Sequence, residues 1–390
     1  MNITSAAISI ITLGSLWGRV WPLLAAILFF GFLILSHELG HFGAARAFRV
    51  SVTEFSMGMG PRLLSRVSKK TGIRYSLKAI PFGGSVLMEE DEGESEDPRA
   101  FVNQKPWKRF YILFAGALVN IVCGVLIMGV IVGLSPEVGT AEVAGFGKRS
   151  VSCDYGLKAG DKILTIDGKR VYSFMDIGFL LSRAKGNQAD LTVRRGGQRV
   201  KLPGVAFPTV EDEAGGAYVA RDFGVVYYSR DPEDEYASGP ATAAMRVEDT
   251  LRQSATMGRM VYLSLWDMVT GKFRLSDISG PIGVVTILSN TAQEVQEASQ
   301  KNNRQQLLDT LLWLLTICGM ISINIGIMNL LPIPALDGGR LLFCAAEMAF
   351  RKPVPKKLEG YVHAAGFALL MLFMVVISFS DIWALVTGSR

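Results

Sequence analysis

Residues 21–41 read WPLLAAILFFGFLILSHELGH and join an apolar run to a polar motif. The run from Trp21 to Leu35, with its flanks, is long enough to cross a bilayer, which takes about 20 apolar residues in a helix. The motif that ends it is HExxH, and residues four apart in a helix lie on one face. Polar groups at the end of a hydrocarbon-facing helix are costly to bury unless they have a use. The stretch therefore predicts a membrane-spanning helix that carries chemistry at one end.

The composition supports a membrane protein, because 49% of the residues are hydrophobic and only 19% are charged. A net charge of +5 gives no case for nucleic-acid binding, and we expect none. We predict a polytopic α-helical membrane protein in contact with membrane lipids. About four transmembrane helices are expected, over residues 19–42, 110–134, 308–331 and 361–386.

Basic residues decide the expected orientation. They cluster between residues 43 and 78, at 105–109 and at 351–357, which are the loops on one side of the four expected spans. Short loops rich in Lys and Arg stay in the cytoplasm. We therefore expect both termini and the segment 135–306 to be extracytoplasmic, and the HExxH motif to lie toward the cytoplasm.

Outside the spans, two segments predict β-structure. Residues 52–88 have strand-like runs bounded by Gly and Pro, which predicts a cytoplasmic-side β-hairpin sheet. Residues 137–207 alternate β-rich runs with glycine turns, as an extracytoplasmic β-rich domain would. An amphipathic helix is predicted over 241–271, with apolar residues that include Leu251, Met257 and Trp266. The expected domains are a membrane region at 1–134, the β-rich domain at 137–207, a linker and amphipathic region at 208–306, and a second membrane region at 307–390.

The HExxH motif points to a metal site. His37 and His41 can bind one zinc ion through imidazole nitrogens at about 2.0–2.1 Å, and Glu38 can act as a general base toward water. Catalytic zinc needs a third protein ligand. Asp337 is one candidate, because Gly338 and Gly339 free the backbone beside it, although a plain helix-ending turn explains the same residues. His363 is the other, but its position beside Tyr361 is more typical of a membrane interface, so Asp337 is the better third ligand.

These residues resemble the site-2 protease family of intramembrane zinc metalloproteases, in the bacterial branch typified by the regulator-of-sigma-E protease. The resemblance implies that His37, His41 and Asp337 hold zinc, that Glu38 is the base, and that Asn329 steadies the substrate backbone. It also implies a single PDZ domain over 137–207 and a location in the bacterial inner membrane. One departure is Ala117, which stands where the family usually has proline. The matching stretches are HELGHFGAAR (37–46), FSMGMGP (55–61), YSLKAIPFGGSVLM (75–88), SGPIG (279–283) and NIGIMNLLPIPALDGGR (324–340).

The function implied by the resemblance is regulated intramembrane proteolysis of single-pass membrane proteins, such as anti-sigma factors or remnant signal peptides. A helical substrate must unwind before hydrolysis, and an open strand edge within Tyr75–Met88 would bind it by β-addition. Gly83 and Gly84 would allow the close approach of its backbone. The alternatives are a non-catalytic membrane PDZ adaptor with a structural metal site, and a transporter. Glu38 disfavours the first, and the lack of inverted repeats disfavours the second.

Overall fold

The computed structural model describes residues 13–88, 96–184, 186–211, 217–231, 233–270 and 304–387. These form two compact units, one from residues within 1–124 and 271–387 and one from residues within 125–270. The SGPIG stretch at 279–283 lies outside the described residues. Each unit is described by itself.

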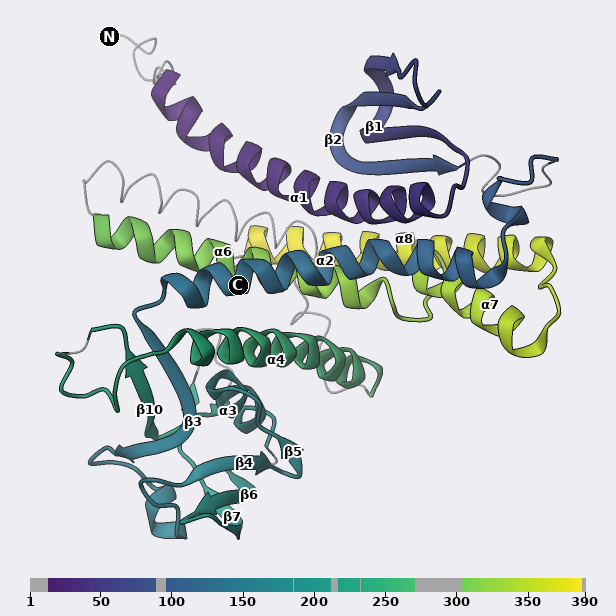
Figure 1. The fold of residues 1–390 in the computed structure, drawn as a ribbon. Helices are drawn as coiled ribbons and strands as arrows, with labels where there is room; N and C mark the ends of the chain where they lie inside the picture. Colours follow the sequence, from purple (N-terminus) through teal and green to yellow (C-terminus); the bar gives the residue numbers. More distant parts are fainter. Residues whose placement is uncertain are drawn as a thin grey trace, which may run out of the picture. The chain divides into compact units, whose positions relative to one another are not determined.

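The first unit is built mainly from helices (Figure 1). Three helices among the described residues have apolar stretches long enough to cross a membrane, at Pro106–Leu134, Leu311–Met328 and Lys356–Phe379. They coincide with three of the expected spans. The fourth, 19–42, lies within the first helix, whose side chains are described only from Phe29 onward. The helices are α1 (Leu13–Ala47), α2 (Pro106–Leu134, which continues into the second unit), α6 (Arg304–Met328), α7 (Asp337–Phe350) and α8 (Lys356–Thr387), with a short 3-10 helix η1 (Phe101–Asn103) before α2.

Small residues let α1, α2 and α6 approach closely. A side chain at Gly40 of α1 would collide with the backbone of Ala115 in α2, and one at Gly326 of α6 would lie 2.8 Å from the carbonyl oxygen of Ala117. Such contacts replace the hydrophobic driving force that is missing between helices in lipid. The helix α2 continues through Ala117 without interruption, and alanine there can donate the backbone hydrogen bond that proline lacks.

A buried polar cluster joins the same three helices. The hydroxyl of Ser36 in α1 lies 2.8 Å from the Asn120 side-chain oxygen in α2, and the hydroxyl of Ser322 in α6 donates to the Asn120 carbonyl at 2.7 Å. All three residues are buried. Because Ser36 precedes His37, this cluster fixes the height of the HExxH motif against α2 and α6.

The predicted sheet over 52–88 consists of two long strands, β1 (Val52–Val67) and β2 (Arg74–Met88), that are antiparallel overall. Each bends on itself, so the register links four segments in the order 84–88, 52–57, 74–77 and 64–67. Glycines with positive φ stand in the bends, with Gly58 and Gly60 at +85° and Gly83 at +92°. Figure 1 shows this folded ribbon next to α1. Segment 84–88 therefore forms an edge, whereas 74–77 lies inside the sheet.

The second unit holds a β-sheet with strand order β10-β3-β4-β6-β7, with β5 paired to β4. Its core is a continuous apolar cluster that includes Val143, Ile177, Val193 and Phe223. The sheet continues to Ser229, past the expected boundary at 207. The elements are β3 (Glu137–Phe146), η2 (Ser152–Tyr155), β4 (Lys162–Ile166), β5 (Lys169–Arg170), α3 (Phe174–Leu181), β6 (Gln188–Arg195), β7 (Gln198–Ala206), β8 (Thr209–Glu211), β9 (Ala217–Val219), β10 (Phe223–Ser229) and α4 (Ala243–Val269).

Candidate metal centre

Three side chains from two distant parts of the first unit meet at one point. The Nε2 atom of His37 lies 2.9 Å from Asp337 Oδ2, and Nε2 of His41 lies 3.1 Å from the same oxygen and 3.1 Å from His37 Nε2. Ligand atoms about 2.0–2.1 Å from a tetrahedral zinc ion lie roughly 3.3 Å from one another. The three atoms here are slightly closer together, so small movements of the side chains would let them bind zinc. Among the described residues, they are the group of His, Cys, Asp and Glu side chains placed to hold a metal ion.

The surroundings of the imidazoles favour metal binding through Nε2. The Nδ1 atom of His41 donates to the Ile112 carbonyl at 2.8 Å, which leaves the Nε2 lone pair free for a metal, as is usual for histidine ligands. A side chain at Gly116, one turn further along α2, would lie under 3.0 Å from both imidazole rings. Ile112 and Gly116 thus form a cradle for the two rings. The residues present fit zinc.

The carboxyl of Asp337 is held in its charged form. Burial alone would raise the pKa of Asp337, but the hydrogen bonds with His37 and His41 outweigh it, so the pKa lies below its usual range. A deprotonated carboxylate is the form that binds a metal ion.

A tightly packed loop delivers Asp337 to this point. Asp337 is the first residue of α7, which follows the loop after α6, and Ala335 in that loop has φ +78°. The Ala335 amide donates to Nδ1 of His363 at 3.1 Å, and a side chain at Gly338 would collide with the Leu331 carbonyl. Of the two candidates for the third position, Asp337 therefore lies with the histidines, while His363 holds the loop that precedes it.

Glu38 lies between the two histidines in sequence and faces the edge of the sheet. Its Oε2 atom accepts a hydrogen bond from the Val86 amide at 3.1 Å. An ideal side chain at Gly84 would lie 2.9 Å from Glu38 Cγ and 3.2 Å from the Ser56 carbonyl oxygen. The general base suggested by the sequence thus touches segment 84–88 directly, and only glycine fits opposite it.

The remaining predicted site residues lie at different distances from this centre. The side-chain amide nitrogen of Asn329 is 3.5 Å from His37 Nε2, at the limit of a hydrogen bond. Gly83 instead faces Met59, whose Cγ would lie 2.9 Å from an added side chain. Sequence reasoning missed Gly116, Ile112 and Val86. The last two act through backbone atoms, which leave no trace in residue type.

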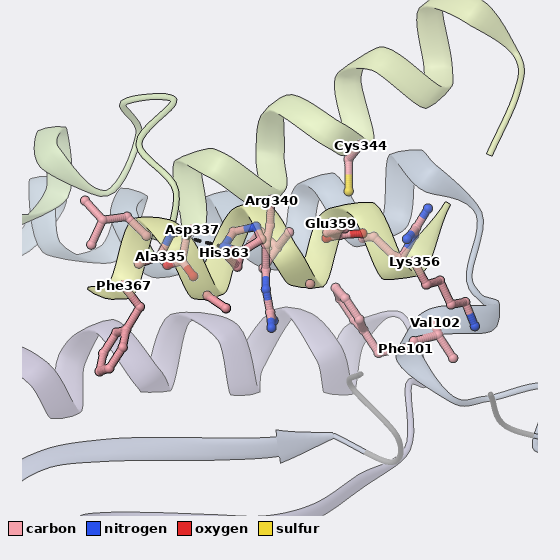
Figure 2. Close-up of a pocket in the computed structure, with 15 residues that line it drawn as sticks. Phe101, Val102, Ala335, Asp337, Arg340, Cys344, Lys356, Glu359, His363 and Phe367 are labelled. Carbon is pink, nitrogen blue, oxygen red and sulfur yellow. Dashed lines mark hydrogen bonds between the residues drawn. The ribbon is translucent and has the colours of Figure 1, made fainter. Parts of the chain in front are cut away.

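A cavity of about 450 Å³ lies beside Asp337. Figure 2 shows its lining, with Asp337 and His363 near one end and Glu359 and Lys356 toward the other. Arg109 of α2 is part of the lining and forms an ion pair with Glu347 of α7. The lining mixes charged side chains such as Lys356 and Glu359 with apolar ones, so water can enter beside Asp337, as a site of hydrolysis requires.

We expect Gly116→Ala to abolish zinc binding, because the new methyl group would occupy the space of both imidazole rings. Alanine favours helix more than glycine does, so loss of α2 would not be the cause. Metal content of the purified protein, measured by mass spectrometry, tests this. The matched control is Gly133→Ala in the same helix, where an added methyl group meets nothing within 4 Å. Full zinc content in Gly116→Ala would contradict the cradle.

Comparison with known proteins gives a consistent picture along nearly the whole chain. Residues 25–373 match peptidase family M50. A relative from Clostridium acetobutylicum, named as a candidate zinc metalloprotease, is 34% identical over 92% of this chain and 96% of its own. Relatives given the same kind of name, from Clostridium perfringens and Fusobacterium nucleatum, are each 32% identical, over 92% and 93% of this chain and 97% and 98% of their own.

Proposed function

Because the chain belongs to peptidase family M50 and is a zinc metalloprotease in a membrane, we propose that it cuts single-pass membrane proteins within or beside their membrane-spanning segments. The observation that carries the proposal is the position of the three potential ligands. His37 and His41 lie near the end of an apolar helix, and Asp337 follows the loop after a candidate membrane span. A site built into membrane helices suits a bond that is itself in the membrane.

In this proposal His37, His41 and Asp337 hold the zinc ion. Zinc, when bound, supplies a Lewis acid that acidifies water and polarises a peptide carbonyl. The Ile112 carbonyl orients the imidazole of His41, and Gly116 leaves room for both imidazole rings. The side-chain amide of Asn329, beside His37, would donate a hydrogen bond to a substrate carbonyl oxygen. Two histidines with one carboxylate leave a coordination position open for chemistry, whereas structural zinc is closed by four protein ligands.

Glu38 is the proton carrier of the proposed reaction. Its carboxylate takes a proton from the attacking water and gives it to the nitrogen of the leaving amine. The hydrogen bond from the Val86 amide holds one oxygen, Oε2, and leaves the other to face the reacting water. The water attacks the peptide carbonyl carbon, the carbon–nitrogen bond breaks, and a carboxylate and an amine leave.

Segment 84–88 is the proposed binding edge for an unwound substrate. It is an edge of the β1–β2 sheet, and it touches Glu38 through Val86 and Gly84. A substrate strand added here would gain partners for the backbone groups it exposes when its helix unwinds. Of the two predicted substrate-binding glycines, Gly84 would then lie beside the reaction and Gly83 would form the bend before it.

We expect Gly84→Ala to lower kcat by about 10²-fold or more while zinc stays bound, because the new methyl group displaces Glu38, and general-base catalysis contributes about 10²–10⁴-fold. The backbone of Gly84 is not in the left-handed region, so alanine tests space rather than strain. Turnover of a reconstituted substrate measures the effect, and Gly43→Ala in α1, which meets nothing within 4 Å, is the control. Wild-type turnover in Gly84→Ala would contradict either the role of Glu38 as the base or the role of segment 84–88 as the binding edge.

We also propose that the protein lies in the bacterial inner membrane with four spans, the metal site toward the cytoplasm and the second unit outside. The clusters of Lys and Arg in the loops of the first unit support this orientation. The β-sheet of the second unit would be a PDZ domain that screens substrates by size. Cys153 in this unit is a free, partly exposed thiol. Membrane-impermeant thiol reagents should label it from outside intact cells, and labelling only after lysis would reverse the orientation.

Cells that carry Glu38→Gln test the substrate class. Membrane fractions should accumulate intact single-pass proteins, such as anti-sigma factors or signal-peptide remnants, that wild-type cells cut. Quantitative proteomics compares the two strains. If only soluble proteins changed in abundance, or none did, the proposed substrate class would be wrong.

A further inference from the structure

The outer face of the β-sheet in the second unit carries a row of basic side chains. Lys162 of β4 lies directly opposite Arg194 of β6, which in turn lies directly opposite Arg199 of β7. Residues directly opposite each other in antiparallel strands point to the same face of the sheet. Lys201 is two residues beyond Arg199 in β7, so it points to that face as well. We call the surface formed by Lys162, Arg194, Arg199 and Lys201 the basic face.

The basic face is turned to solvent. The residues that alternate with it, among them Ile163 and Val193, are 2% and 0% exposed and belong to the apolar core. The core therefore covers one side of β4 and β6, and the basic side chains project from the other side. Three of them are exposed, and Lys162 is half-buried. Figure 1 shows β6 and β7 on the side of the second unit that is away from α4.

No acidic side chain neutralises the basic face within the part of the chain that the structure describes. Other arginines of this unit do have acidic partners. Arg259 pairs with Asp176, which is fully buried in the first turn of α3. Arg183, after α3, pairs with Asp267 of α4. By contrast, the four side chains of the basic face form no ion pair and no hydrogen bond with any described residue.

Two carboxylates of the same sheet do not change this. Glu142 of β3 lies opposite Lys162, at the end of the row, but forms no ion pair with it. Asp190 of β6 accepts a hydrogen bond of 2.8 Å from the Gly204 amide. Like charges directly opposite each other destabilise a sheet, and Arg194 stands between two of them. An arrangement that opposes folding indicates a use outside the fold.

The spacing of the basic face fits the carboxylates of an extended acidic peptide. Arg199 and Lys201 are two residues apart in a strand, which separates their Cα atoms by about 6.6–6.8 Å. Alternate side chains of an extended peptide have the same repeat and point to the same side. Arg194 lies on the neighbouring strand, about 4.8 Å away across the sheet, and its side chain is long enough to reach the same peptide. Guanidinium groups bind carboxylates with two parallel hydrogen bonds.

The basic face lacks the apolar side chains with which proteins insert into a bilayer surface. Segments that lie in a membrane surface combine basic residues with exposed apolar ones. Among the described residues of β4, β6 and β7, no large apolar side chain is exposed. A polar, acidic partner from the aqueous phase therefore fits the basic face better than lipid does.

We propose that the basic face docks an extended acidic segment of a substrate protein, with Asp or Glu at alternate positions, outside the membrane. This docking rests on the proposed function, in which the second unit meets the extracytoplasmic part of the substrate. It adds a selection by charge to the selection by size. A docked substrate stays tethered while its membrane segment binds at the metal site, so docking lowers KM and leaves kcat unchanged.

Binding of a peptide to the full-length protein tests the proposal without any cleavage. The Glu38→Gln protein is placed in nanodiscs of phosphatidylcholine, and the anisotropy of a dye-labelled peptide that alternates Asp with Ser gives the Kd. Arg194→Glu and Arg199→Glu each reverse one charge of the basic face. The control Arg252→Glu makes the same change on α4, outside the basic face. A peptide that alternates Asn with Ser is the second control.

We expect Arg194→Glu and Arg199→Glu to raise the Kd at least about tenfold, and Arg252→Glu to leave it within about twofold. The Asn peptide should not bind. Equal weakening in all three variants would overturn the proposal, because only overall charge would then matter. Absence of binding to the intact basic face would overturn it as well. So would capture by phosphatidylglycerol vesicles that Arg194→Glu abolishes without any change in peptide binding, because lipid would then be the partner.

Thermal unfolding separates docking from folding. Arg194→Glu replaces two repulsive cross-strand pairs by attractive ones, so its Tm should equal or exceed that of the parent protein. A lower Tm would contradict the repulsion from which the docking site is inferred. Because the binding assay involves no cleavage, its failure leaves the proposed function unaffected, and absence of proteolysis leaves the binding result unaffected.

Discussion

Glu38→Gln is expected to abolish proteolysis and to leave zinc at about one ion per chain. Glutamine keeps the shape of the side chain, and its oxygen can still accept from the Val86 amide. It cannot take a proton from water, and loss of a general base costs about 10²–10⁴-fold in rate. Turnover of a single-pass substrate in proteoliposomes and zinc content of the same preparation are measured together.

The control is Glu137→Gln, an exposed carboxylate in β3 that should leave both values unchanged. If Glu38→Gln kept activity within tenfold of wild type, another group would be the base. If it lost zinc instead, Glu38 would be a ligand or a support for one, and its proposed role would be wrong.

Removal of one proposed zinc ligand should have an equally large effect on metal content. His37→Ala and His41→Ala each leave two of three protein ligands, and we expect zinc content to fall below about a tenth of an ion per chain. Asp337→Asn keeps the size of the side chain but removes the charge that binds the ion. Its zinc content should fall as well, and activity should be lost in all three variants.

His363→Ala separates the third ligand from the loop that carries it. His363 accepts from Ala335, two residues before Asp337, so its loss should loosen the loop but keep the ligand. Zinc should still bind fully at saturating metal, with weaker affinity by about 10–100-fold, as for other groups that orient ligands. Full zinc in Asp337→Asn and none in His363→Ala would reverse the assignment.

The sequence predicted most features that depend on the type and spacing of residues. Three apolar stretches became long helices, and the runs at 52–88 became a sheet. His41 and Asp337 are 296 positions apart, and their meeting was implied by resemblance to a family rather than by spacing. Local chemistry favoured Asp337 over His363 as the third ligand, and the structure places His363 against the Ala335 amide.

What the sequence could not predict depends on backbone geometry or on a choice between faces. The open edge expected within Tyr75–Met88 is limited to segment 84–88, because β1 and β2 fold back on themselves and place segment 74–77 inside the sheet. Periodicity likewise predicted an amphipathic helix over 241–271, but it could not predict that six of the seven buried residues described in α4 are polar. Only the partners Asp176 and Arg183, distant in sequence, decide that.

The central claim is that this zinc site hydrolyses a bond in the membrane, and the position of the cut tests it most directly. Purified protein in proteoliposomes is given a single-pass substrate, and mass spectrometry of both products locates the broken bond. The account predicts a cut inside the substrate's apolar segment of about 20 residues, or within a few residues of its cytoplasmic end, and none with Glu38→Gln. A cut far out in a soluble tail, or one that persists in Glu38→Gln, would contradict it.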